Sequence, residues 1–235
     1  MVERVQNRVQ NNETRRAMLA AIREHLATSE PFDAVRNEHR AHAGEPPRGS
    51  AVTVSQEQAA SLVERFQLAV EAVAGRCLVV RDEAEAAEAV RLIIEQKNAR
   101  RIAVTNSPLV QRVVKRVKSD AELLENVVPP ALFDCDIGIT SAQWAVAETG
   151  TLVLESDEER HRLASLVPPV HIAIIEADQI RHTLGEVLRM LSEKGQDRLS
   201  PTVTFITGPS RTSDIELTLA IGVHGPAELY VILLR

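Results

Sequence analysis

Residues 77–108, CLVVRDEAEAAEAVRLIIEQKNARRIAVTNSP, decide the fold class. The stretch opens with a short apolar run typical of a buried strand, and Asp82-x-x-Glu85 then predicts the start of a helix with apolar residues at helical spacing. A second apolar run, Ile102–Thr105, predicts another strand, and Ser107-Pro108 matches the N-cap and first position of a further helix. This order of elements is typical of right-handed βαβ units and therefore of a largely parallel sheet.

The same alternation continues outward on both sides. Before the stretch, a capping box at Ser55 predicts a helix that ends at Gly75. After it, apolar runs at Cys135–Ile139, Thr151–Glu155 and Val170–Ile175 predict further strands. We expect residues 141–148, between the first two of these runs, to form a helix that breaks at Glu148.

The C-terminal segment changes period. Residues 215–223 alternate apolar and small or polar side chains, which predicts a half-buried strand. His224-Gly225-Pro226 predicts a turn, and Tyr230–Leu234 predicts a buried return strand. We therefore expect an α/β fold with a mostly parallel sheet sandwiched by helices and closed by a C-terminal β-hairpin.

The chain divides by composition into two parts. Residues 1–50 predict a helical arm followed by a Pro- and Gly-containing linker, and residues 51–235 predict one domain. The arm is either loosely attached or clasps another subunit or a partner, and a homo-oligomer is one such arrangement.

Composition excludes several classes of protein. The 235 residues are 44% hydrophobic and 26% charged, as in globular proteins. A net charge of −6 and only 3% aromatic residues argue against nucleic-acid binding. No apolar stretch suits a membrane span or a signal peptide, which predicts a cytoplasmic protein. Cys77 and Cys135 lie far apart, and no zinc-ligand spacing is present, so we expect no metal and no iron–sulfur cluster in this chain.

The first candidate site segment runs from Thr140 to Thr151. Glu148 is followed by Thr149-Gly150-Thr151, so a carboxylate stands beside hydroxyls at an element boundary. The carboxylate suits a catalytic base or nucleophile, with Thr140, Thr149, Gly150 and Thr151 binding the ligand. The alternative is simple helix termination, with Gly150 at positive φ.

The second candidate segment, TGPSRTSD at residues 207–214, follows an apolar strand. Glycine and hydroxyl residues after a strand suit a backbone-amide nest for an anion, and Arg211 adds recognition of a carboxylate or phosphate. The alternative is a turn in which Arg211 pairs with Asp214 or Glu216. The ligand-binding candidates in this region are Gly208, Ser210, Arg211, Thr212, Asp214 and Glu216.

The third segment is the turn around His224. An imidazole titrates near neutrality, so His224 is a candidate general acid or base, with Gly225 beside it as a ligand-binding position. The alternative is a turn histidine that donates to a backbone carbonyl.

Taken together, the motifs resemble those of the LUD-domain family. The matching stretches are GIT at Gly138–Thr140, AETGTLVL at Ala147–Leu154, LVPPVHI at Leu166–Ile172, GPSRTSDIE at Gly208–Glu216 and GVHGPAEL at Gly222–Leu229. The resemblance covers roughly residues 50–235 and implies a fold similar to the NagB/RpiA/CoA-transferase group. It also implies a role in oxidising L-lactate to pyruvate with partner proteins that carry iron–sulfur clusters.

Within such a system this chain is expected to be the cluster-free member that binds a small anionic ligand, a lactate-like carboxylate or a phosphate. Two other functions remain open. One is a stand-alone transferase, hydrolase or isomerase acting on an acyl-CoA or sugar phosphate, with Glu148 as nucleophile in the transferase case. The other is a non-catalytic module that binds an organic acid.

Overall fold

The computed structural model describes residues 20, 56–125, 127, 129–156, 162–194, 198, 200–213, 219–222 and 224–235. All elements below belong to the unit Val54–Arg235. The arm and linker expected at residues 1–50 lie outside the described residues, apart from residue 20.

The core of the fold is a six-stranded sheet in which every neighbouring pair is parallel. In spatial order its strands are β1 (Arg76–Val80), β12 (Glu228–Leu234), β7 (Val170–Glu176), β4 (Ile137–Ser141), β2 (Arg101–Val104) and β3 (Glu122–Glu125). The parallel α/β class expected from residues 77–108 is therefore confirmed.

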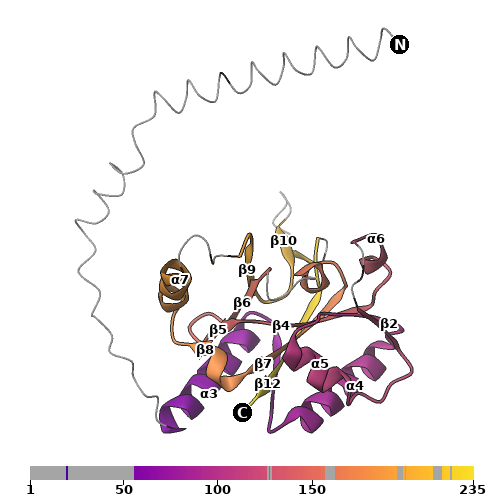
Figure 1. Cartoon of the computed structure of the whole chain (residues 1–235), viewed down its shortest axis with the longest axis horizontal. Helices are drawn as coiled ribbons and strands as arrows, with labels where there is room; N and C mark the ends of the chain where they lie inside the picture. Colours follow the sequence, from indigo (N-terminus) through magenta and orange to yellow (C-terminus); the bar gives the residue numbers. More distant parts are fainter. Residues whose placement is uncertain are drawn as a thin grey trace, which may run out of the picture. The chain divides into compact units, whose positions relative to one another are not determined.

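One face of this sheet is covered by α4 (Glu83–Lys97) and α5 (Pro108–Val114), which lie together in Figure 1. Asp82 begins α4 as its N-cap, accepting the amides of Ala84 and Glu85 at 2.9 Å. Asn98 ends the helix in the left-handed conformation. Val90 and Ile94 of this helix are among the buried residues that cover the face.

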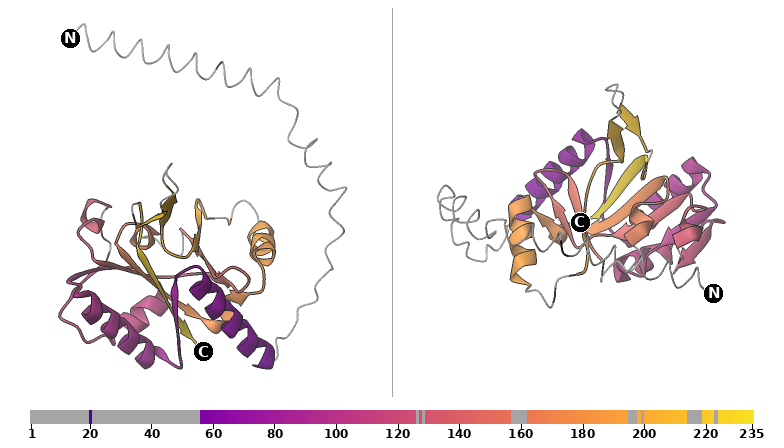
Figure 2. Two further views of the ribbon diagram at one scale, coloured as in Figure 1. Left: turned by 180° about the vertical axis from the view of Figure 1, so that it is seen from behind. Right: turned by 90° about the horizontal axis from the view of Figure 1, so that it is seen from above.

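The opposite face is covered by α3 (Gln56–Ala72) and by a second, mixed sheet. That sheet has the order β8 (Ile180–Arg181), β5 (Trp144–Val146), β6 (Thr151–Glu155) and β9 (Val203–Thr207). On its outer side packs α7 (Leu184–Glu193), through Val187 and Leu191 against Trp144. Figure 2 shows the same layers from two further directions.

Three short elements complete this face. α6 (Pro129–Leu132) and the 3-10 helix η1 (Arg162–Ser165) lie near β2 and β4, whereas the 3-10 helix η2 (Ala177–Gln179) follows β7 and contacts α3. η1 approaches β4 closely at Gly138. A Cβ there would lie 1.7 Å from the backbone oxygen of Ala164, so only glycine fits. This contact holds η1, which precedes β7 in the chain, against β4 of the six-stranded sheet.

The expected C-terminal hairpin is wrong. Tyr230–Leu234 belongs to β12, which lies between β1 and β7 in the parallel sheet. Leu229–Leu234 is buried throughout, and a strand with both faces apolar is stabilised where both faces are covered. The strand β11 (Leu219–Ile221) pairs instead with β10 (Arg211–Ser213), which precedes it.

The helix expected at residues 141–148 is also wrong. Trp144–Val146 is strand β5, antiparallel to β6, and residues 147–150 form the turn between them. The Gln143 side chain accepts the Glu155 amide at 2.5 Å and helps to hold the two strands together. A short apolar run of this kind does not distinguish a strand from a buried helical turn.

No helix in the described part of the chain has the length and apolar content that spanning a bilayer requires.

Candidate functional site

Two of the motifs singled out in the sequence meet in space. The Ser210 amide donates to the Pro226 carbonyl at 2.8 Å, and the Gly222 amide donates to the Ser210 carbonyl at 2.9 Å. A Cβ on Gly225 would lie 3.0 Å from the Ser210 Cβ, so the two loops pack closely. The segment after β9 and the turn before β12 therefore form one wall.

This wall lines a half-open cavity of about 210 Å³. Its lining residues are Ser165, Leu166, His171, Thr204, Phe205, Ile206, Thr207, Gly208, Pro209, Ser210, His224, Gly225, Pro226 and Leu229. His171 and Leu229 are the second residues of β7 and β12. The cavity therefore lies at the amino ends of these parallel strands, beside β9 of the mixed sheet, rather than at the carboxyl ends where α/β proteins commonly bind ligands.

The buried histidine of the cavity is His171, which was not among the residues predicted for the site. Its Nε2 lies 2.9 Å from the Thr140 hydroxyl, and its Nδ1 has no hydrogen-bond partner among the described residues. Burial lowers the pKa of His171 to about 3, so the ring is neutral at physiological pH. The available signal was a histidine inside the apolar run Val170–Ile175, since a buried polar group in a strand usually has a specific partner.

The register of β4 and β7 explains this pairing. Gly138 is the register partner of His171, so no side chain stands opposite the imidazole on β4. The ring therefore reaches Thr140, two residues along the strand on the same face. Thr140, which was predicted to bind the ligand, is fully buried and is not among the described cavity residues. It contacts His171, which does line the cavity.

The cavity has no permanently positive side chain among its described lining residues. Among the described residues that line it, none is Lys or Arg. Arg211 is exposed, and its Nη2 donates to the Val73 carbonyl at 2.7 Å, near the C-terminal end of α3. The Ser210 amide, a member of the predicted nest, already donates to Pro226. Any anion buried in the cavity would lose hydration without a Lys or Arg to pair with, and this cost is larger for a multiply charged phosphate than for a singly charged carboxylate.

The segment around Glu148 reaches the cavity only indirectly. Glu148 is exposed in the β5–β6 turn, and its amide donates to the His182 carbonyl at 3.1 Å. The Thr151 hydroxyl lies 2.6 Å from that of Thr149 and 2.8 Å from that of Thr207, which lines the cavity. This chain of hydroxyls joins the first motif to the second.

Gly150 and Gly208 fix the position of α3 relative to these motifs. Both have positive φ, and a Cβ on Gly208 would lie 2.4 Å from the Val73 carbonyl oxygen. A Cβ on Gly150 would similarly lie 2.5 Å from the Val70 amide nitrogen. Both turns therefore require glycine, for backbone conformation and for space. Thr212 lies in β10, whereas Asp214 and Glu216 lie outside the described residues.

No metal site is evident where the structure can be described, since these residues contain no group of three or more His, Cys, Asp or Glu side chains suited to an ion. Cys77 and Cys135 are free and buried, on β1 and before β4. Burial raises the pKa of the Cys77 thiol to about 12, so it is a protonated side chain that packs in the core.

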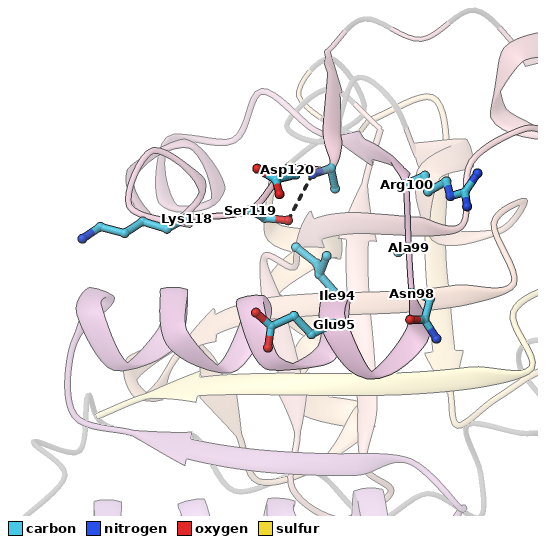
Figure 3. A pocket seen from close by; sticks show the side chains of 9 residues that line it. Ile94, Glu95, Asn98, Ala99, Arg100, Lys118, Ser119 and Asp120 are labelled. Atoms are coloured by element: carbon cyan, nitrogen blue, oxygen red, sulfur yellow. Dashed lines mark hydrogen bonds between the residues drawn. The ribbon is translucent and has the colours of Figure 1, made fainter.

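A second hollow lies between the end of α4 and the segment before β3, and Figure 3 shows its side chains. Lys118, Arg100, Glu95 and Asp120 point in different directions around it. The Ser119 hydroxyl accepts the Ala121 amide within its own turn. Because the charged groups do not converge, we place the functional site at the His171 cavity.

The fold and the cavity define an α/β protein with a small cavity at the amino edge of a parallel sheet, a candidate site without Lys or Arg among its described lining. A family model described as LUD domain matches residues 63–234. The chain therefore belongs to the LUD domain family.

Relatives and a solved structure agree with this assignment. A protein of Halalkalibacterium halodurans named "Lactate utilization protein C" is 36% identical over 59% of this chain and 64% of its own length. The match thus spans slightly less than two thirds of that relative. A protein of the same name from Exiguobacterium sp. is 33% identical over 67% of this chain and 71% of its own. The crystal structure of a DUF162 family protein from Deinococcus radiodurans superposes with a TM-score of 0.59 at 23% identity, covering 75% of this chain and 98% of that one, and shows the same fold.

Proposed function

We propose that this chain is the cluster-free component of an L-lactate utilisation system in the cytoplasm, acting with iron–sulfur partner proteins that oxidise lactate to pyruvate. The names of its relatives support the lactate role. The cluster-free assignment is supported by its two separate cysteines, both of them buried. The iron–sulfur clusters of the system would then belong to its partners.

The observation that carries the ligand part of the proposal is the His171 cavity. Residues of three of the family-like motifs line it, it has polar groups but no Lys or Arg among its described lining, and its volume is about 210 Å³. The cavity is half-open and its volume has room for a small organic molecule. We propose that its ligand is a small organic acid.

A transferase, hydrolase or isomerase activity, and the likeness to the NagB/RpiA/CoA-transferase group, stay predictions. The exposed Glu148 is not among the described cavity residues, and the small cavity without a lining cation offers no support for a sugar phosphate or a CoA thioester. A purified chain that turns over an acyl-CoA, with loss of turnover in Glu148→Gln, would establish that alternative.

The test begins with the tagged chain purified from its native host grown on L-lactate, and from the same host grown without it. The proposal expects co-purified iron-containing proteins and lactate-dependent dye reduction from the first culture only. Chemically crosslinked cultures retain partners that associate weakly. A crosslinked eluate without iron-containing partners would refute the complex.

The cavity is tested by complementation of a strain that lacks this chain. Ser210→Leu places an apolar side chain at the cavity wall, and Ser192→Leu makes the same exchange on an exposed position of α7. We expect growth on L-lactate to fail with the first variant and to persist with the second, at matched protein levels. Equal growth of both strains would contradict a functional role for the cavity.

A further inference from the structure

We propose that two copies of this chain associate through the open edge of β1, which pairs with itself antiparallel across a two-fold axis and joins the two six-stranded sheets into one. β1 is the last strand on its side of the sheet, and among the described residues it pairs only with β12. α3 and α4 pack on its two faces (Figure 2). The groove along this edge shares no lining residue with the His171 cavity, so the inference is independent of the proposed ligand.

An open groove of about 730 Å³ follows the edge of β1. All five residues of the strand line it, with Gln67 of α3 on one side and Ala89 and Leu92 of α4 on the other. Leu78 in the middle of the strand is 40% exposed, and Leu92 is 51% exposed. Strand edges that stay free in solution commonly carry charged residues or proline, because an apolar edge attracts a further strand. The groove therefore has the backbone edge and the apolar sides that an added strand requires.

The hydrogen bonds between β1 and β12 show which backbone groups face the groove. The Val80 carbonyl accepts the amide of Arg235, which follows β12, at 3.0 Å, so the backbone groups of Val80 point toward β12. Successive residues of a strand direct their amide and carbonyl groups to opposite sides. Those of Cys77 and Val79 therefore point to the open edge, where neither residue has a backbone partner among the described residues. A second strand can pair with these four groups.

A second copy of β1, running antiparallel, matches these groups in one register. Cys77 of each copy then stands opposite Val79 of the other, and all four groups of each strand are paired. The two Leu78 side chains meet at the axis as a non-hydrogen-bonded pair, in which side chains approach most closely. A shift of two residues would require the amide of Gly75 or that of Arg81. These already donate, to the Val70 carbonyl at 2.9 Å and to the Glu85 carboxylate at 2.8 Å.

The charges along the groove are complementary to themselves. Arg76 lines it at the amino end of β1, whereas Glu85 and Glu88 line it near the carboxyl end, because α4 follows the strand directly. A two-fold axis at Leu78 places Arg76 of each copy toward the acidic end of the other. All three charged groups also have ion-pair partners within their own chain, so these charges favour the antiparallel orientation and add little affinity. Self-complementarity of this kind is what a closed two-fold contact requires, which favours a second copy as the occupant.

The experiment measures the mass of the full chain by sedimentation over a concentration series, with amide exchange on the same samples. We expect a monomer–dimer equilibrium in which the Cys77 and Val79 amides exchange more slowly as the dimer forms. Leu78→Lys places two like charges opposite each other and removes the apolar contact, so it should weaken dimerisation by about tenfold or more. Leu188→Lys is the matched control, because Leu188 is similarly exposed, at 49%, but lies on α7. It should leave dimerisation unchanged.

A crosslink tests the register. In Leu78→Cys the two introduced thiols would face each other at the axis, so oxidised glutathione should join the copies through them, whereas Leu188→Cys should stay uncrosslinked. A wild-type chain that stays monomeric throughout the series would overturn the proposal. A dimer equally stable in Leu78→Lys would also overturn it. Slow exchange at Cys77 and Val79 in a monomer would show that the chain covers this edge itself, and would overturn it without any variant.

Discussion

Acidification is predicted to destabilise the protein through His171. The folded protein holds this ring neutral, with a pKa of about 3, whereas the ordinary value is 6.5. Well above pH 6.5 the ring is neutral in both states and contributes no pH dependence. As the pH falls below 6.5, the unfolded chain binds a proton that the folded chain cannot, so stability is lost progressively between pH 6.5 and 3.

The size of the effect follows from the two pKa values. At pH 5.5 the loss is about 1.4 kcal/mol, and at pH 4.5 it is about 2.7 kcal/mol. The second figure changes little if the folded value is a full unit higher, because pH 4.5 would still lie above it. A loss of this size is a large share of the ~5–15 kcal/mol that stabilises a typical domain.

Carboxylates titrate in the same range, so the comparison with a variant isolates the histidine. His171→Gln removes the titrating ring while retaining a polar group that faces Thr140. Urea unfolding of both proteins from pH 7 to 4.5 should show the wild type losing about 2.7 kcal/mol more than the variant. If the free energy of unfolding changed with pH by the same amount in both proteins, His171 would not be a buried neutral ring.

Three further predictions concern stability, each measured by urea unfolding. Gly138→Ala should cost roughly 3 kcal/mol or more, because its Cβ meets backbone at 1.7 Å, whereas Gly185→Ala, with only a 3.9 Å contact in α7, should be neutral or slightly stabilising. Asp82→Ala should cost about 1 kcal/mol, because two amides of α4 lose their acceptor. Lys194→Met should cost about 2 kcal/mol, because it removes the cation paired with Glu155, which is 1% exposed.

Each of these has a result that would count against it. Equal stability of the two glycine variants would mean that η1 does not pack on β4 as described. If the Asp82→Ala protein were as stable as the wild type, the Asp82 cap would not contribute to stability. Glu155→Gln is the control for the ion pair: its amide can still accept from Ser200, whose hydroxyl lies 3.3 Å from the carboxylate, so it should cost less than Lys194→Met. The reverse order would contradict the pairing.

Local periodicity accounts for the elements that could be predicted. The strands β2 (Arg101–Val104) and β7 (Val170–Glu176) and the helix after Asp82 follow from apolar spacing and capping residues that are close in sequence. The two wrong predictions have different causes. A helix was expected at 141–148 because a short apolar run does not distinguish a strand from a helical turn, whereas the C-terminal hairpin assumed a strand partner from chain proximity. β12 instead pairs with β1, about 150 residues earlier in the chain.

Some of the residues predicted for the candidate site do line the cavity, whereas Arg211 does not. Glycine and hydroxyl residues marked Gly208, Ser210 and Gly225 as unusual for their apolar surroundings, and the structure brings these three to one cavity wall. Arg211 carried the strongest chemical signal in that segment, yet its guanidinium donates to a carbonyl near the end of α3. Side-chain direction depends on what packs nearby, which residue type alone does not specify.

The sequence by itself determined the order of strands and helices, and from that order the α/β class and the parallel sheet, as well as the glycine-rich turns. The residues that specify each strand, helix or turn lie within a few positions of one another. Only the tertiary structure decided that the cavity lies at the amino ends of β7 and β12, and that His171 faces Thr140 across Gly138. The physical reason is register. A strand's partner and alignment arise from the burial of whole faces against distant segments, and that alignment places a histidine from one strand beside a threonine from another.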